Sequence, residues 1–315
     1  MLDYKISVVI PYYNDSSNFI RCINSVIKQT AQPLEVIIID DCSEDSPVLI
    51  DILSSYKDIE FEIICKRNTI NMNGAFSRNR GIEIASGEFV ALLDADDFWD
   101  STHLELCLSC IIENSNADFI YSDYYSEYKV GKFSRIKTAD INNLINQSDI
   151  VLKDTPQTNS FFFRRKIFPL VKFDESLRRH QDFQFLLSVV QKNINIIRGG
   201  FCSSYYCLSP RPIKKRVDFN SMFIFWNDNY HLFTQQKIDR YLDSILYTSM
   251  CINGTFGASD LISRQLVFKR SSYCKLPKLV KYIGDDKNFK VFILRLLYVF
   301  VFDVKNLINR LRKIS

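Results

Sequence analysis

Apolar runs and helical patterns alternate along the first hundred residues. Four runs rich in Val and Ile have the length of buried strands, and we expect strands at Ile6–Pro11, Glu35–Asp40, Glu60–Cys65 and Glu88–Leu93. Between them, apolar residues spaced three and four apart predict helices over Ser17–Gln29, from Ser46 onward and over Gly74–Ala85. Strands that alternate with helices indicate an α/β fold with a mainly parallel sheet flanked by helices.

The order of elements changes after about residue 101. The pattern predicts a helix to Asn114, a hairpin-like turn at Val130-Gly131, a helix over Asp182–Gln191, and strands at Asp118–Tyr128, at Asn159–Arg164 and within Arg198–Ser209. Beyond residue 212 the pattern is helical to the end. We therefore expect an α/β domain over residues 1–212 and a helical C-terminal region over residues 213–315.

Polar side chains cluster where three of the predicted strands end. Strand 1 runs into Tyr12-Tyr13-Asn14-Asp15, strand 2 into Asp40–Asp45, and strand 4 into Asp94–Asp97. Parallel strands bring their carboxyl ends to one edge, and packed carboxylates repel one another unless a cation or ligand uses them. This predicts a divalent cation bound together with substrate phosphates.

Each of these groups also has a structural interpretation when it is taken alone. Asp41, which lies two residues before Ser43, suits a turn or a helix cap, and the two tyrosines suit packing. The acidic group Asp94–Asp97 could cap the helix that follows Trp99. Their joint position at one edge is what favours a site.

Two common nucleotide-binding classes are disfavoured. A dinucleotide-binding oxidoreductase also has an acidic residue after strand 2, but it needs a glycine-rich first turn against the pyrophosphate. Here that turn is Pro11-Tyr-Tyr-Asn-Asp-Ser16, which contains no glycine, and the chain has no P-loop. Without a glycine cradle, a metal ion must do much of the neutralisation of a bound diphosphate.

Five ordered blocks resemble the inverting family-2 glycosyltransferases. They are Ser7–Asn14, Ser25–Thr30, Glu35–Asp45, Ser77–Gly81 and Gly87–Trp99, and the resemblance extends over about residues 5–210. It implies the GT-A nucleotide-diphospho-sugar transferase fold, with a nucleotide-binding half over 1–100 and an acceptor half over 101–212.

The resemblance also implies roles for individual residues. Pro11, Tyr13 and Asp41 would hold the nucleoside, Tyr13 by stacking and Asp41 at the uracil edge, and Arg78 would face the nucleotide. Asp94-Ala-Asp96 matches the DxD motif of the family. Asp94 would serve the nucleotide, while Asp96 and Asp97 would serve a divalent metal, Mn²⁺ or Mg²⁺.

A second motif, Phe173–Leu177 followed by Arg179–Asp182, resembles the family segment that supplies the catalytic base. Its first acid is replaced here by Gln181, so the base role falls on Asp182. An N-cap of the following helix is the structural alternative for Asp182. His180 and Gln181 are acceptor-side candidates, and His180 is a second choice of base.

Charge is distributed unevenly along the chain. Residues 264–315 contain 13 Lys/Arg and three Asp, whereas residues 1–263 contain 27 basic and 33 acidic residues. The apolar run Phe289–Phe302 is shorter than the ~20 residues that a membrane-spanning helix needs. A short apolar run among basic residues is typical of a helix at an anionic membrane surface, and packing on the domain or on a second subunit is the alternative.

The N-terminus reads as a strand rather than as a signal peptide, which predicts a cytoplasmic protein with reduced thiols. Cys107 and Cys110 have zinc-like spacing without a second pair, which favours core packing.

We therefore expect a metal-dependent transferase at the inner face of the cell membrane. It would move a sugar from a nucleotide-sugar donor to a glycan or undecaprenyl-linked saccharide in cell-surface polysaccharide synthesis. The resemblance favours a UDP-sugar as the donor, because the family commonly uses UDP. A homo-oligomer is compatible with the sequence. The alternatives are a catalytically inactive sugar-nucleotide-binding or scaffold protein, and a nucleic-acid-binding protein, for which the chain has no motif.

Overall fold

The computed structural model describes residues 4–152, 154–208, 218–234 and 237–238. It divides into two compact units, Met1–Pro210 and Arg211–Ser315. The predicted helical region over 213–315, including the apolar run Phe289–Phe302, lies largely outside the described residues. Within the second unit, the structure describes helix α7 (Phe219–Asn229), in which Trp226 packs against Phe225, and the 3-10 turn η5 (Tyr230–Leu232).

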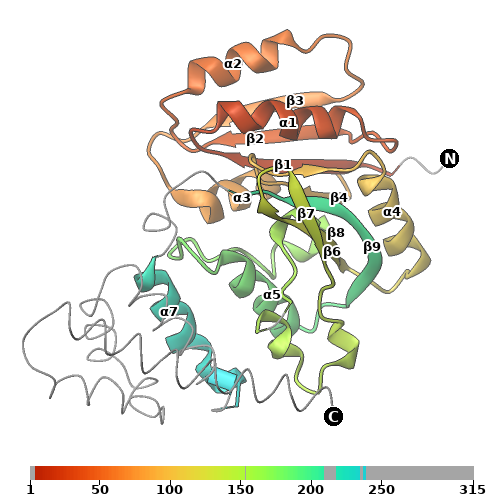
Figure 1. Ribbon diagram of the computed structural model, residues 1–315, viewed down its shortest axis with the longest axis vertical. Helices are drawn as coiled ribbons and strands as arrows, with labels where there is room; N and C mark the ends of the chain where they lie inside the picture. Colours follow the sequence, from red (N-terminus) through yellow and green to blue (C-terminus); the bar gives the residue numbers. More distant parts are fainter. Residues whose placement is uncertain (1–3, 153, 209–217, 235–236, 239–315) are drawn as a thin grey trace, which may run out of the picture. The chain divides into compact units, whose positions relative to one another are not determined.

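The first hundred residues form the predicted alternation of strands and helices. The strands are β1 (Ile6–Tyr12), β2 (Glu35–Asp40), β3 (Glu62–Arg67) and β4 (Phe89–Leu92), and the helices are α1 (Ser16–Ile27), α2 (Ser46–Ser55) and α3 (Asn73–Ile84). These strands are parallel, in the order β3-β2-β1-β4. Figure 1 shows β3, β2 and β1 stacked in this order, with the second half of the unit continuing the sheet beyond β4.

The two faces of β1 pack against different helices. Val8 and Ile10 belong to one core with Phe19 of α1, whereas Val9 lies against Gly81 of α3. Successive side chains on a strand point to opposite faces, so both faces of β1 are covered. This is why the strand reads as continuously apolar in the sequence.

The second half of the unit adds antiparallel pairs. Its elements are β5 (Phe98–Trp99), α4 (His103–Glu113), β6 (Phe119–Lys129), β7 (Lys132–Ile136), β8 (Phe162–Arg164), α5 (Gln181–Gln191) and β9 (Ile196–Tyr206), with 3-10 turns η1 (Ile141–Asn143), η2 (Gln147–Val151), η3 (Thr158–Ser160) and η4 (Arg165–Ile167). Strand β8 lies between β4 and β6 and runs antiparallel to both. Strand β6 therefore points the same way as β4, and its carboxyl end lies at the same edge of the sheet.

The start of helix α2 and the burial of Cys107 agree with the sequence predictions. Helix α2 begins at Ser46 as predicted, and Asp45 occupies its N-cap position without a side-chain capping bond. The Asp45 carboxylate instead accepts hydrogen bonds from Tyr12 Oη (2.7 Å) and from the backbone N of Ser16 (3.0 Å). Cys107 is buried in the core with its thiol free, as the packing interpretation predicted.

None of the described helices combines the length and the apolar character that crossing a membrane requires.

Candidate functional site

The loops that follow β1 and β2 form one rim at the carboxyl edge of the sheet. Asn14 donates from its backbone N to Ser43 Oγ (3.1 Å), and its side-chain oxygen accepts from the backbone N of Glu44 (2.7 Å). Pro11 is half-buried near the end of β1, and Tyr13, just beyond the strand, is 40% exposed. An aromatic ring thus lies accessible at the rim, where the sequence predicted a nucleoside contact.

Asp41 connects this rim to the start of α3. The side chain is buried, and its Oδ1 accepts from Asn68 Nδ2 and from the backbone N of Met72, both at 2.8 Å. Its Oδ2 accepts from the backbone N of Asn73, the first residue of α3, at 2.8 Å. A carboxylate at a helix N-terminus offsets the unpaired N–H groups and the helix dipole there. Because a carboxylate has about four lone-pair positions, these bonds leave capacity for one more donor.

Arg78 of α3 links the acidic loop after β4 to the start of α5. Its Nη1 donates to Gln181 Oε1 (2.8 Å), and its Nη2 forms an ion pair with the Asp94 carboxylate. The guanidinium lies over the ring of Phe173, 5.4 Å from the centroid. Arg78 is only 8% exposed, and its buried Nε–H has no hydrogen-bond partner among the described residues. An unsatisfied buried donor of this kind is rare and suits an anionic ligand.

The three acids of the loop after β4 differ in their environments. Asp97 is 1% exposed, and its carboxylate accepts from Asn159 Nδ2 (2.9 Å) and from the backbone N of Cys207 (2.8 Å). Burial, reinforced by the charges of Asp96 and Asp94, raises the pKa of Asp97. Asp96 is half-buried, and its backbone carbonyl accepts from Arg21 Nη2 (2.8 Å).

These environments bear on how a metal could bind. In the part of the chain that the structure describes, no group of three or more His, Cys, Asp or Glu side chains is arranged to hold an ion. The oxygen donors of the loop nevertheless fit a hard cation held by one carboxylate together with substrate phosphates. Of the two acids that the family resemblance assigns to a metal, Asp96 is the more accessible, because it is half-buried whereas Asp97 is 1% exposed.

The acceptor-side residues lie at the first turn of α5. His180 adopts the left-handed backbone conformation (φ 63°) and occupies the N-cap position, so Asp182 is inside the first turn and does not cap the helix. Burial raises the pKa of Asp182 to about 6, against the opposing effect of the Arg78 charge. Burial and the Arg179 charge lower the pKa of His180 to about 4. At neutral pH the site therefore has an ionised Asp182 beside a neutral His180.

Tyr206 also belongs to this cluster. It is 42% exposed, and burial of its hydroxyl together with the nearby charges of Asp97, Asp96, Asp182 and Asp94 raises its pKa to about 12. The sequence analysis predicted the strand that carries Tyr206 but not the register that brings its end to the acidic loop. The same register places Cys207 N against Asp97.

The chain resembles solved structures of Staphylococcus aureus TarS. The complex of TarS residues 1–349 with UDP-GlcNAc matches with a TM-score of 0.58 at 19% identity and covers 89% of this chain and 82% of that one. The UDP complex matches with a TM-score of 0.56 at 21% identity, covering 83% and 76%. At this level of identity the likeness concerns the fold, and it confirms the predicted GT-A architecture.

Sequence comparisons agree with this fold. Residues 7–173, more than half of the chain, match the family model of glycosyl transferase family 2. The amylovoran biosynthesis glycosyltransferase AmsB of Erwinia amylovora is 26% identical over 325 residues, covering 99% of this chain and 98% of AmsB. The UDP-Glc:alpha-D-GlcNAc-diphosphoundecaprenol beta-1,3-glucosyltransferase WfgD of Escherichia coli is 32% identical over 224 residues, covering 68% and 81%.

The fold and the acidic strand ends thus define a glycosyltransferase with the GT-A architecture. The chain belongs to glycosyl transferase family 2.

Proposed function

We propose that the protein transfers a sugar from a UDP-sugar to a hydroxyl group of a lipid-linked saccharide, with inversion at the anomeric carbon. The arrangement around Arg78 carries this proposal. One buried guanidinium joins the acidic loop, through Asp94, to Gln181, and Asp182 follows directly in the same helical turn. A donor diphosphate at the acidic loop and an acceptor hydroxyl at α5 would then lie on opposite sides of Arg78.

The donor would be held by the rim and the acidic loop. Tyr13 stacks on the base, Asp41 accepts the imide N–H through its remaining lone pair, and Pro11 shapes the rim between them. Arg78 Nε donates to the nucleotide. Asp96 would hold Mn²⁺ or Mg²⁺, and the bound ion would offset the charge that the leaving diphosphate gains.

Asp182 would act as the general base. The acceptor oxygen forms its bond to the anomeric carbon while the carboxylate takes the hydroxyl proton, and the bond between that carbon and the diphosphate oxygen breaks on the opposite face. A single displacement of this kind inverts the anomeric centre. A carboxylate with a pKa near 6 is ionised at neutral pH and is more basic than an ordinary one.

The choice of substrates rests on relatives. WfgD is named for transfer from UDP-Glc to GlcNAc-diphosphoundecaprenol and AmsB for amylovoran biosynthesis, and the TarS structures contain UDP and UDP-GlcNAc. These names support a role in cell-surface polysaccharide synthesis at the inner face of the membrane. We assign catalysis to residues 1–212, with donor binding in 1–100 and acceptor binding in 101–212, and membrane attachment to residues 213–315.

The proposal is tested by a transfer assay with full-length protein, a panel of UDP-sugars, Mn²⁺ or Mg²⁺ and a GlcNAc-diphospho-lipid acceptor. We expect turnover with one donor, loss of turnover in EDTA, and a product of inverted configuration by NMR.

Asp96→Asn should abolish turnover and keep the melting temperature. Asp97→Asn should lower both, because the Asp97 carboxylate accepts hydrogen bonds from both Asn159 and Cys207. Tight UDP-sugar binding without turnover on any acceptor would favour a catalytically inactive binding protein, and full activity in EDTA would remove the metal from the mechanism.

A further inference from the structure

The β6–β7 hairpin extends beyond the edge of the sheet that carries the site. Ala91 of β4 and Ile120 of β6 both pair with Phe162 of β8, so they lie at the same level. Strand β4 ends one residue later, while β6 continues to Lys129, which is about 26 Å further along the strand. Strand β9 pairs with β6 only as far as Ser126 and Tyr206, and the tip beyond that point is paired within the hairpin.

The tip presents apolar and basic side chains and no exposed acid. Tyr128 is 65% exposed and Val130 87%, and Gly131 makes the turn with a positive φ of 71°. Residues 124–137 contain four basic side chains, Lys129, Lys132, Arg135 and Lys137, all exposed. None of the three lysines has an acidic partner within salt-bridge distance among the described residues.

The acid of the hairpin, Glu127, is turned inward. It is 8% exposed, and its carboxylate accepts from the backbone N of Gly131 (2.6 Å) and of Leu208 (2.7 Å). The outward surface of the hairpin is therefore positively charged, although the neighbouring site is acidic.

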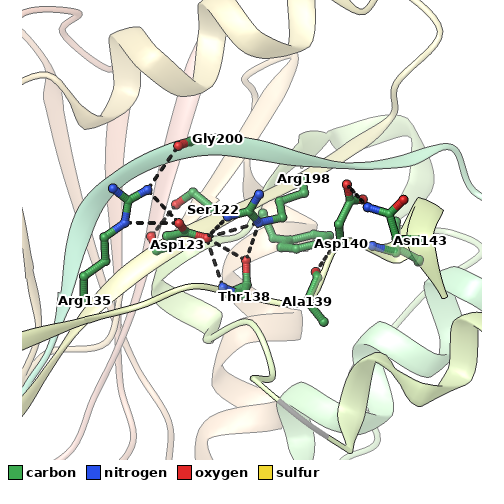
Figure 2. Close-up of polar contacts among 11 residues, drawn as sticks. Ser122, Asp123, Arg135, Thr138, Ala139, Asp140, Asn143, Arg198 and Gly200 are labelled. Carbon is green, nitrogen blue, oxygen red and sulfur yellow. Dashed lines mark hydrogen bonds and ion pairs between the residues drawn. The ribbon is translucent and has the colours of Figure 1, made fainter. Parts of the chain in front are cut away.

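The base of the hairpin is held firmly. The buried carboxylate of Asp123 accepts hydrogen bonds from Arg135 Nη2 of β7 (2.7 Å) and from Arg198 Nη2 of β9 (2.5 Å). It also accepts one from Thr138 Oγ1 (3.0 Å). Figure 2 shows the two arginines converging on Asp123 from different strands. Nearer the tip, Phe133 of β7 packs on Phe98 of β5, the strand that follows the acidic loop, with ring centroids 5.9 Å apart. The tip is thus carried on a fixed support beside the site.

We propose that the tip of this hairpin, residues 128–132, inserts into the surface of an anionic bilayer and holds the site edge against it. Tyrosine and valine can enter the headgroup region while the lysines contact lipid phosphates. Two apolar side chains are far too little surface for a stable protein interface, which buries roughly 800 Å² on each partner. If the acceptor is lipid-linked, which rests on the proposed function, its diphosphate lies at this surface. Tyr206, which belongs to the site, pairs with Ser126 of β6, so the site lies roughly 13 Å along the strand from the tip.

The direct test places a fluorophore at the tip of the full-length protein. Both natural tryptophans, Trp99 and Trp226, are buried, so an introduced exposed tryptophan dominates any change in emission. Val130→Trp should shift to the blue on addition of phosphatidylglycerol vesicles and not with phosphatidylcholine vesicles. The matched control is Ile145→Trp, because Ile145 is fully exposed. It lies in the sequence between Asn142 and Gln147, which line a cavity with Ala117 and Ile196 at the amino ends of β6 and β9, the edge of the sheet opposite the tip. Ile145→Trp should not shift.

The binding test uses Lys129→Gln/Lys132→Gln in the full-length protein. Each basic residue beside an anionic bilayer strengthens binding about fivefold, so the pair should weaken sedimentation with these vesicles about 25-fold. UDP-sugar affinity should be unchanged, and this shows that the variant is folded. Vesicle binding does not require turnover, so a negative result here would leave the proposed transferase activity untouched. A bound protein whose Val130→Trp emission does not move would overturn the proposal. A blue shift that depends on protein concentration without vesicles would instead assign the tip to a second copy of the chain.

Discussion

Burial of the Asp182 carboxyl has opposite consequences for folding and for catalysis. The folded protein raises its pKa from 3.8 to about 6. A carboxyl whose pKa is raised on folding favours the folded state only while it is protonated, and this contribution is lost as the pH rises through the folded-state pKa. At neutral pH the ionised Asp182 therefore costs stability, and the same shift makes it a better base.

Replacing Asp182 with asparagine should separate these two effects. We expect kcat of Asp182→Asn to fall by ~10²–10⁴, the usual contribution of a general base, with near-normal UDP-sugar affinity. The thermal midpoint should equal or exceed that of the wild type at pH 8, and the difference should shrink as the pH falls through about 6. The wild-type rate should itself decline below about pH 6, and the residual rate of the variant should not show this step.

Kinetics and calorimetry across pH 5–8 measure both quantities on the same two proteins. A near-normal kcat would remove the base role from Asp182 and assign it to His180, the second choice, or to Glu175 in the preceding motif Phe173–Leu177. A lower midpoint at pH 8 would show that the carboxylate stabilises the first turn of α5.

At the residue scale, local motifs predicted which side chains gather and did not predict their partners. Asp94 stood out because it lies at the end of a strand, whereas Arg78 and Asp182 stood out because they lie in segments that resemble the family. The partners of Asp97, which are Asn159 and Cys207, come from residues 62 and 110 positions further on. Contacts at that separation depend on strand register, and hydrophobic pattern does not specify the register of a strand that is irregularly paired.

At the scale of elements, the packing of α3 on the sheet explains why the block Ser77–Gly81 ends in glycine. A Cβ added at Gly81 would collide with Cγ1 of Val9 on β1 and would lie 3.4 Å from Cγ1 of Ile39 on β2. The helix can therefore approach the strands closely, which positions Arg78 one turn earlier.

Gly81→Ala should lower the free energy of unfolding by about 1–3 kcal/mol, the usual cost of overpacking a core. This is opposite in sign to the gain of roughly 0.5–1 kcal/mol that alanine normally brings inside a helix. Gly200→Ala is the control, because a Cβ there meets no atom within 4 Å. Urea unfolding of the two variants measures the difference. Equal stabilities would mean that α3 shifts away from β1 at little cost.

Element boundaries were predicted best where burial is continuous. Strand β2 was predicted without error, since its six residues are all buried. Strand β3 begins two residues later than predicted, and its exposed pattern explains the weaker signal. The predicted strand Asn159–Arg164 contains the last two residues of the 3-10 turn η3 and then the three-residue strand β8. That short strand is the one that turns the sheet antiparallel, and composition carries no signal for strand direction.

At the scale of the whole molecule, charge separates the chain into two parts. The 52 residues from 264 to 315 carry 13 basic and three acidic side chains, while the remainder is acidic on balance. An acidic body is repelled by an anionic membrane, so attachment requires a local positive surface. The hairpin tip provides one at the edge of the site, and the C-terminal sequence provides a second by composition.

We therefore expect the C-terminal sequence to strengthen membrane binding independently of the hairpin. Removing residues 285–315 should release most of the protein from phosphatidylglycerol vesicles and leave UDP-sugar affinity unchanged, because the proposed donor residues all lie within the first 100 positions. Binding of the full-length protein should weaken steeply with salt, since exposed charges are screened over about 8 Å at 0.15 M.

The full-length variant Arg310→Gln/Arg312→Gln/Lys313→Gln is the matched control for truncation. Its binding should fall in the same direction, and more steeply when it is combined with Lys129→Gln/Lys132→Gln. Equal sedimentation of the truncated and intact proteins would assign membrane attachment to the hairpin edge alone, and preferential binding to duplex DNA would revive a nucleic-acid partner for the basic C-terminal sequence.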